Sequence, residues 1–366
     1  MKKLILSSVM LMFATVGFSQ FNNSAVNQTG NGNASTVDQI GATNESTVDQ
    51  VGDNNGSDVD QTGINNDNDV DQLGNDNTST VMQLGNTNAA DVHQGYGAGA
   101  SINDDNSALI AQTGNENGGH IDQYGDADGS DGNSSSINQS GDFNYAYNFQ
   151  EGDLNISTQD QIGVSNDSFV IQLGDSNQSY DFQIGDDNES NVDQFGDSNA
   201  ASLEQNGVNN DSEVFQFGNG NESLTLQGYF GAGGNDHIST VDQIGDNNMS
   251  FVGQDGTANF SDVDQVGDAN DSWVGQIGFT NISDVVQTGA NNTSFVDQNG
   301  DDNNSDVDQV GDDNYSNVDQ NGFLQSSIVL QTGNMNTSDV MQNGNNHMSN
   351  VNQLGNSNGS VVIQNN

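Results

Sequence analysis

A strict 11-residue period runs through almost the whole chain, and no other feature constrains the fold as strongly. Thirty glutamines mark the period from Gln28 to Gln364, and most of the series is evenly spaced, as in Gln39, Gln50 and Gln61. Three longer intervals run between Gln94 and Gln112, between Gln123 and Gln139, and between Gln227 and Gln243. We interpret each of them as one unit that carries an insertion. Self-similarity of this kind predicts a repeat architecture.

Each of these glutamines, taken as position 0, has nearly the same neighbours. Asn stands at position −6 and Gly at +2 in 27 of the 30 units each, and Ser stands at −4 in 24. Val, Ile or Leu stands at −2 in 26 units. The exceptions at −6 are His237, Gln325 and His347, and those at −2 are Asn148, Gln159, Asp181 and Thr225. The consensus unit is N-x-S-x-V-D-Q-x-G-D-x.

This unit predicts a strand followed by a turn. Positions −6, −4, −2 and 0 are two apart, so they lie on one face of an extended strand, and Val suits that setting. The G-D-x-N stretch is typical of turns, because Gly, Asn and Asp tolerate positive φ. A right-handed helical supercoil also has an 11-residue repeat. We set it aside because a glycine in every unit costs about 1 kcal/mol per helical position relative to Ala.

We predict an all-β fold, a β-solenoid of about 15 coils of 22 residues in which each coil holds two of the 30 strand-turn units. Two strands per coil give every strand a face to pack against, so two parallel sheets face each other. At about 4.8 Å per coil the rod would be about 70 Å long. One 11-residue unit per coil is the alternative geometry. Such narrow solenoids often rely on disulfides, and the chain contains no cysteine.

In a 22-residue coil each residue stacks on its equivalent one coil away, so every inward column repeats one side chain. Stacked amides donate and accept along the column, which satisfies polar groups that are otherwise costly to bury. The predicted ladder glutamines are Gln39, Gln50, Gln61, Gln72, Gln83, Gln172, Gln194, Gln243, Gln254, Gln265, Gln276, Gln309 and Gln353. The predicted ladder asparagines are Asn44, Asn66, Asn166, Asn188, Asn248, Asn270 and Asn303. The predicted turn glycines are Gly52, Gly74, Gly174, Gly196, Gly245, Gly267 and Gly311.

Residues 1–20 have the pattern of a secretory signal, and residues 21–366 form the predicted solenoid. Lys2 and Lys3 precede an apolar run from Leu4 to Phe18, which is short for a membrane-spanning helix. A retained membrane anchor is the competing interpretation. We expect an exported protein.

The chain is strongly acidic, with 52 Asp and Glu against two Lys and no Arg. Because no Lys or Arg follows the signal, we exclude nucleic acid as a partner. The acidic residues favour positions −1 and +3, as at Asp38 and Asp175, and would form outward columns of like charge. We expect these columns either to bind divalent cations weakly or simply to solvate the surface. A hydrophobic content of 31% with this charge is also typical of disorder, but the strict period argues against it.

No feature of the sequence predicts an enzyme. Carboxylate pairs recur with the period, whereas an active site is a single constellation. His237 and His347 take the ladder position of Asn, while His93 and His120 lie on the opposite face, so we expect no histidine cluster with metal-ligand spacing. We therefore expect no catalytic site, no cofactor and no bound transition metal.

The chain resembles the curlin family, the repeat-built subunits of bacterial curli fibres, which are functional amyloids. One double unit that shows the resemblance consists of Asn248, Ser250, Val252, Gln254 and Gly256, followed by Asn259, Ser261, Val263, Gln265 and Gly267. The match extends over residues 22–366. The resemblance implies a subunit that a Gram-negative bacterium secretes into a cell-surface fibre, with a nucleator subunit and outer-membrane export machinery as partners.

Our expectation is a secreted structural protein that stacks end to end into a homopolymeric amyloid fibre of the biofilm matrix and serves cell adhesion. Residues 362–366 end inside a unit and would leave a strand edge for the next subunit. The alternative is a monomeric, surface-exposed solenoid that binds ice or carbohydrate. Position −3 varies from Thr36 to Trp273, so no continuous threonine lattice supports ice binding. We expect the three insertions to be kinks or lateral contacts.

Overall fold

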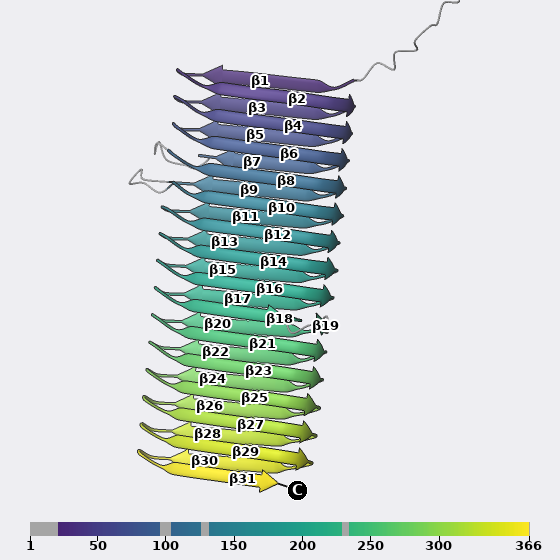
Figure 1. The fold of residues 1–366 in the computed structure, drawn as a ribbon. Helices are drawn as coiled ribbons and strands as arrows, with labels where there is room; N and C mark the ends of the chain where they lie inside the picture. The colour runs from purple at the N-terminus through teal and green to yellow at the C-terminus, as the bar shows by residue number, and fades with distance from the viewer. Residues whose placement is uncertain (1–20, 96–103, 126–131, 229–233, 366) are drawn as a thin grey trace, which may run out of the picture.

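The computed structural model describes residues 21–95, 104–125, 132–228 and 234–365. Within these ranges the chain forms 31 strands and no helix, and the strands build two parallel sheets (Figure 1). The predicted signal at residues 1–20 lies outside the described residues, as do parts of all three insertions. A helix long and apolar enough to cross a membrane is therefore not found in the described ranges.

Up to β18, the odd-numbered strands lie in the first sheet and the even-numbered strands lie in the second. The first sheet contains, in spatial order, β1 (Asn23–Thr29), β3 (Glu45–Val51), β5 (Asp67–Leu73), β7 (Ala89–Gln94), β9 (Gly118–Tyr124), β11 (Tyr145–Glu151), β13 (Asp167–Leu173), β15 (Glu189–Phe195), β17 (Asp211–Phe217), β20 (Ile238–Ile244), β22 (Phe260–Val266), β24 (Ile282–Thr288), β26 (Asn304–Val310), β28 (Ser326–Thr332) and β30 (Met348–Leu354). The second contains β2 (Ala34–Ala42), β4 (Gly56–Ile64), β6 (Thr78–Asn86), β8 (Ser107–Asn115), β10 (Ser134–Asp142), β12 (Ile156–Val164), β14 (Gln178–Asp186), β16 (Ala200–Val208), β18 (Glu222–Gln227), β21 (Met249–Thr257), β23 (Asp271–Phe279), β25 (Thr293–Asp301), β27 (Tyr315–Phe323), β29 (Thr337–Asn345) and β31 (Gly359–Asn365). The two-residue strand β19 (Gly234–Asn235) pairs with β16 and β21.

One coil consists of one strand from each sheet and the two corners that join them. Outside the insertions, residue i pairs with residue i+22 of the next coil, as Gln50 does with Gln72. Each inward column therefore repeats the same position of the unit. The predicted β-solenoid of about 15 coils of 22 residues, with two parallel sheets, is confirmed.

The three insertions lie at corners. The first two follow β7 and β9, at the same corner of successive coils, and the third follows β18, at the opposite corner (Figure 1). Across the first insertion Gln83 pairs with Gln112, and across the second Gln112 pairs with Gln139. The same columns meet again beyond each insertion, so the extra residues lengthen a corner and leave the strands in register.

The corners explain why glycine stands at +2. The predicted turn glycines all have positive φ, and a Cβ built on Gly174 would lie 2.2 Å from the carbonyl oxygen of Gly196 in the next coil. A side chain there would collide with the neighbouring backbone. A second residue with positive φ stands at +4, as at Asp187 (φ 56°) and Leu324 (φ 55°). This left-handed position is the variable residue of the G-D-x-N turn, and it accepts many residue types.

The core between the sheets consists mainly of the side chain at −2. Val59 and Val285, for example, have no exposed surface. Burying a valine of this kind contributes about 1.5 to 3 kcal/mol. The buried apolar side chains form two clusters, one from Val48 to Ala146 and one that begins at Val170.

A buried polar network separates these two apolar clusters. Asn148, Gln159 and Asp181 replace the apolar residue at −2 in this part of the rod. Gln159 Nε2 donates to Ser168 Oγ at 2.8 Å, and the hydroxyls of Ser168 and Ser190 both donate to Asp181 Oδ2. A carboxylate inside the core makes this stretch sensitive to pH.

Asp181→Asn is expected to flatten part of the dependence of stability on pH. Burial raises the pKa of Asp181 to about 6, although the two serine hydrogen bonds lower it. Because the folded pKa lies above that of an unfolded aspartate, protonation stabilises the fold. This contribution is complete below about pH 4 and is lost as the pH rises through about 6. A folded pKa that lies about two above the unfolded value corresponds to about 3 kcal/mol of stabilisation by the protonated form.

Urea unfolding at pH 4 and at pH 7 measures the effect. Between these two values the wild type should lose about 2 kcal/mol more stability than Asp181→Asn, because part of the full effect already lies below pH 4. Asp58→Asn, on the exposed outer face of β4, is the matched control and should keep the wild-type difference. If both variants lose as much stability as the wild type, the buried carboxylate is not the cause.

Candidate functional site

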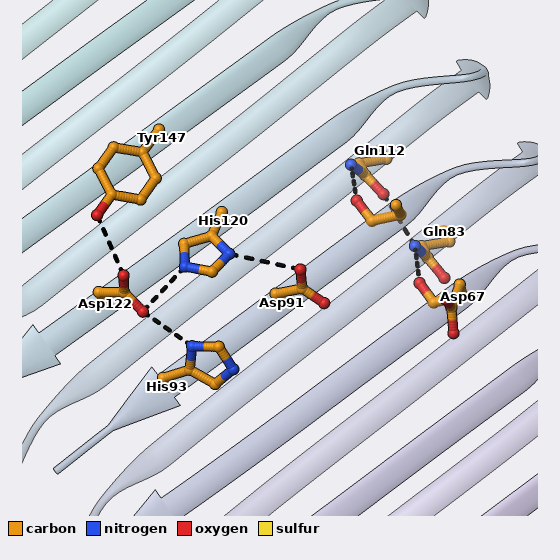
Figure 2. Close-up of polar contacts among 9 residues, drawn as sticks. Asp67, Gln83, Asp91, His93, Gln112, His120, Asp122 and Tyr147 are labelled. Carbon is orange, nitrogen blue, oxygen red and sulfur yellow. Dashed lines mark hydrogen bonds and ion pairs between the residues drawn. The ribbon is translucent and has the colours of Figure 1, made fainter. Parts of the chain in front are cut away.

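Columns of glutamine amides connect neighbouring coils and tie the two sheets together. Gln83 Nε2 donates to Gln112 Oε1 in the next coil at 3.0 Å and to the backbone oxygen of Asp67 on the facing sheet at 2.8 Å (Figure 2). Its own Oε1 accepts from Gln61 at 2.8 Å. All polar atoms of the amide are therefore used. Of the predicted ladder glutamines, Gln39 is half-buried in the first coil and the others are buried.

The asparagines at −6 satisfy the backbone at the corners. Asn44 Oδ1 accepts from the backbone N–H of Asn66 in the next coil at 3.0 Å. Asn44 Nδ2 donates to the backbone oxygen of Gly63 at 3.2 Å, and Asn66 repeats this bond with Gly85 at 3.0 Å. The predicted ladder asparagines are all buried. This position thus provides an acceptor for one turn and a donor for another.

Two of the replacements at −6 keep parts of this pattern. His237 has no exposed surface, and its Nδ1 accepts from the backbone N–H of Asn259 at 3.2 Å. Burial lowers the pKa of His237 to about 4, so the imidazole is neutral and can act as this acceptor. Gln325 Nε2 donates to the backbone oxygen of Gly344 at 2.8 Å, as an asparagine would. The ladder therefore tolerates other side chains that offer the same polar groups.

The serine column at −4 differs from the amide columns. The hydroxyls of Ser250, Ser272 and Ser294 are buried without a hydrogen-bond partner among the described residues. Away from the network around Asp181, serine at this position contributes its small volume to a narrow interior, and the amides carry the polar connections between coils.

The amide ladders have a direction. Along the glutamine columns Nε2 donates toward the C-terminal end of the rod, and Oε1 accepts from the N-terminal side. In the first coil Gln28 Nε2 donates to Gln50 in the second coil, and the described residues include no earlier coil that could donate to Gln28 Oε1. In the last coil Gln353 and Gln364 donate to the backbone oxygens of Thr337 and Met348, at 2.8 and 2.9 Å. Each of these two amides has a second N–H, which interior glutamines use on the next coil.

The two end coils also expose faces that are buried in the interior. Every residue of β1 is exposed, and Val26 at −2 keeps 44% of its surface accessible, whereas Val48 one coil further on keeps none. At the other end β31 contains no buried residue, and Val362 packs only in part against the core. Both ends of the described rod are therefore open edges of paired sheets.

The predicted acidic columns at −1 and +3 differ in their surroundings. At −1, on the outer face of the first sheet, burial raises the pKa of Asp264. Its neighbour Asp262, at −3, has a pKa raised to about 6 by burial and then by nearby carboxylates, of which Asp264 acts most strongly. At +3 the carboxylate instead accepts a backbone hydrogen bond, as Asp197 Oδ1 does from the N–H of Asp175 at 3.0 Å. The corner columns are thus part of the coil-to-coil bonding.

The expectation that no histidines cluster is wrong for His93 and His120. Their ring centroids lie 5.1 Å apart, and His93 Nδ1 and His120 Nε2 each lie 2.9 Å from Asp122 Oδ1 (Figure 2). Burial lowers the pKa of His120, but hydrogen bonds to Asp122 and Asp91 outweigh it and raise the value to about 9. Burial raises the pKa of Asp122, yet hydrogen bonds from both histidines hold it well below its usual range. The cluster forms because the columns stay in register across the first insertion: His93 pairs with Asp122 in the −1 column, and Asp91 pairs with His120 in the −3 column.

Three stretches, residues 196–224, 281–311 and 311–344, match the family model of the curlin associated repeat. The chain contains curlin associated repeats. The matched stretches contain strands of both sheets and the same inward columns as the rest of the rod. The curlin-repeat family is structural rather than enzymatic. A comparison with curated proteins finds no match.

Proposed function

We propose that this curlin-repeat protein is a secreted structural subunit of a curli-like amyloid fibre and that it assembles by end-to-end stacking of its coils. The observation that carries the proposal is the pair of open end coils, which expose complementary halves of the same hydrogen-bond ladder. Sheet edges of this kind are templates for another chain.

The joint between two copies would repeat the contact between two interior coils. β1 of one copy would pair with β30 of the preceding copy, and β2 with β31. Gln353 and Gln364 would then donate their second N–H to Gln28 and Gln39 of the next copy. The two faces are different, so the contact is heterologous and does not close on itself. Repetition of such a contact gives a filament with cross-β structure.

The outward residues at the joint are compatible with close stacking. In the first sheet position −1 is Asn27 in the first coil and Asn352 in the last, whereas interior coils such as that of Asp264 carry a carboxylate there. At the joint, two amide side chains would therefore lie beside each other in this column. The repulsion between two carboxylates would be avoided there.

Under this proposal the subunit acts outside a Gram-negative cell, in a surface fibre of the biofilm matrix that supports adhesion. A nucleator subunit and outer-membrane export machinery would be its partners, in addition to further copies of itself. Weak binding of divalent cations along the acidic columns belongs to the same proposal, and assembly rates that do not change between calcium and chelator would contradict that part.

Val26→Lys is expected to slow fibre growth by about 100-fold. The substitution puts a cation on the face of β1 that the next copy must cover, and burying an unpaired charge costs several kcal/mol. About 3 kcal/mol corresponds to a factor of about 100. Thioflavin fluorescence and electron microscopy on seeded reactions of the purified chain measure the growth rate.

Ala25→Lys is the matched control, because it adds the same charge to the same strand on the outward face. It should grow at close to the wild-type rate, and both variants should give the wild-type circular dichroism spectrum. Seeded growth of Val26→Lys at the wild-type rate would contradict end-to-end stacking. A wild-type chain that stays a folded monomer in the presence of seeds would favour the monomeric binding solenoid instead.

A further inference from the structure

The cluster of histidine and aspartate side chains on the outer face of the first sheet plays no part in the ladders. It spans β7, β9 and β11, which are neighbours in that sheet. The register across the first insertion pairs His93 with Asp122 and Asp91 with His120, so the two histidines lie diagonally across adjacent strands. Figure 2 shows both imidazoles directed at the carboxylate of Asp122.

The ligand atoms of this cluster converge. One ligand atom from each of His93, His120 and Asp122 lies within 4.8 Å of the other two. His93 Nδ1 and His120 Nε2 both lie 2.9 Å from Asp122 Oδ1. Asp122 is 7% exposed and the two histidines are half-buried, so the group is partly shielded by the sheet surface. The distances between these atoms are small enough for one ion to reach all three.

We propose that His93, His120 and Asp122 bind one divalent transition-metal ion, with Zn²⁺ as the reference ion. Two imidazole nitrogens and one carboxylate oxygen are a ligand set typical of zinc, which takes a fourth ligand from water in open sites. Ca²⁺ and Mg²⁺ prefer all-oxygen sites, so the imidazoles favour a transition metal over these more abundant ions.

Second-layer contacts orient these ligands. His120 Nδ1 lies 3.4 Å from Asp91 Oδ2, which leaves Nε2 facing Asp122. Tyr147 donates from its hydroxyl to Asp122 Oδ2 at 3.1 Å, and its ring stacks on His120 with centroids 5.2 Å apart. A carboxylate behind a ligating histidine is a common feature of zinc sites and fixes the tautomer of the ring.

Neighbouring carboxylates make the surroundings of His93 attractive to a cation. Asp69 and Asp71 on β5 form a second group with His93 in which potential ligand atoms again lie within 4.8 Å. Because His93 belongs to both groups, one ion would engage it at a time. The expected stoichiometry is therefore one Zn²⁺ per chain.

The bound ion would cross-link the strands on either side of the first insertion. His93 lies on β7, immediately before that insertion, and the other two ligands lie on β9 in the next coil. The connection between these two coils is the one that the insertion lengthens. An ion that joins them would stabilise the folded rod, since ligands in the unfolded chain are not held together.

Isothermal titration of the purified chain with ZnCl₂ at pH 8 tests the proposal. The wild type should bind one equivalent, and His93→Asn and His120→Asn should lose this binding. Asp91→Asn should weaken it by about tenfold, because the second-layer carboxylate is lost. His347→Asn removes a histidine from the ladder instead and should bind like the wild type. Zn²⁺ should also raise the melting temperature of the wild type and leave that of His120→Asn unchanged.

A second measurement needs no variant. In the NMR spectrum of the wild type, the imidazole signals of two of the four histidines should shift on addition of Zn²⁺. Three outcomes would assign the ion to the acidic surface at large and overturn the proposal. They are equal shifts of all four histidines, displacement of Zn²⁺ by an excess of Ca²⁺, and equal binding by His120→Asn and the wild type. Absence of zinc binding by the wild type would also overturn the proposal.

Discussion

Gly267→Ala is expected to break the solenoid at the corner between β22 and β23. Gly267 has a φ of +122°, and a Cβ built on it would lie 2.0 Å from the carbonyl oxygen of Gly289 in the next coil. The strained backbone alone costs about 1 to 3 kcal/mol in a residue other than glycine. The collision cannot be relieved by a side-chain rotation, because the atom on the other side is backbone. We expect a total loss of about 5 kcal/mol or more.

The loss should be local, because each coil contacts only its neighbours in a solenoid. Trp273 is the single tryptophan, lies on β23 directly after this corner, and stacks on Phe251 with ring centroids 5.7 Å apart. Its fluorescence therefore reports on the affected coil, and limited proteolysis should cut near residue 267. Gly56→Ala is the matched control, because a Cβ there meets nothing within 4 Å. If both variants unfold at the same urea concentration, close approach of the corners does not explain the glycine column.

The regular part of the fold is predictable because its columns are long. A position repeated in almost every unit has the same neighbours above and below, so the identity of Gln83 is enough to infer a partner such as Gln61 one coil away. The alternation of inward and outward residues follows from the same spacing. The 22-residue coil follows because a strand buried on one face needs a second strand opposite.

The features that the sequence did not predict depend on details that the period does not fix. The histidine cluster depends on which variable outward residues fall beside one another, and on the columns staying in register across the first insertion, so that His93 pairs with Asp122. The buried polar network at Asp181 requires knowing that two neighbouring serines of one column, Ser168 and Ser190, donate to the same buried carboxylate. The direction of the amide ladder requires the geometry of each amide, because the sequence is the same for either direction.

Gln265→Glu is expected to destabilise the solenoid strongly at neutral pH. Gln265 Nε2 donates to Gln287 Oε1 at 2.8 Å and to the backbone oxygen of Met249 at 2.9 Å, while its Oε1 accepts from Gln243 at 2.9 Å. A glutamate carboxylate can still accept the hydrogen bond from Gln243, but it has no donor. Its negative charge would lie against two acceptors, Gln287 Oε1 and the backbone oxygen of Met249. Each buried group left without its partner costs about 1 to 3 kcal/mol, and more when it is charged, so we expect a loss of about 5 kcal/mol.

Low pH should recover part of this loss. Burial favours the neutral form of a carboxyl group, so the pKa of a glutamate at position 265 would lie above its unfolded value of about 4.3. Protonation then stabilises the folded state, and this stabilisation is complete below about pH 4 and disappears as the pH rises through the folded pKa. A protonated carboxyl group also regains one donor for Gln287 or Met249. Urea unfolding at pH 4 and 7 measures the recovery, and Gln178→Glu on an exposed position of β14 controls for the added charge. Equal stability of the two variants at pH 7 would show that the amide column contributes little. A large difference in stability that narrows at pH 4 would instead identify the donated hydrogen bonds as the interaction that holds consecutive coils together.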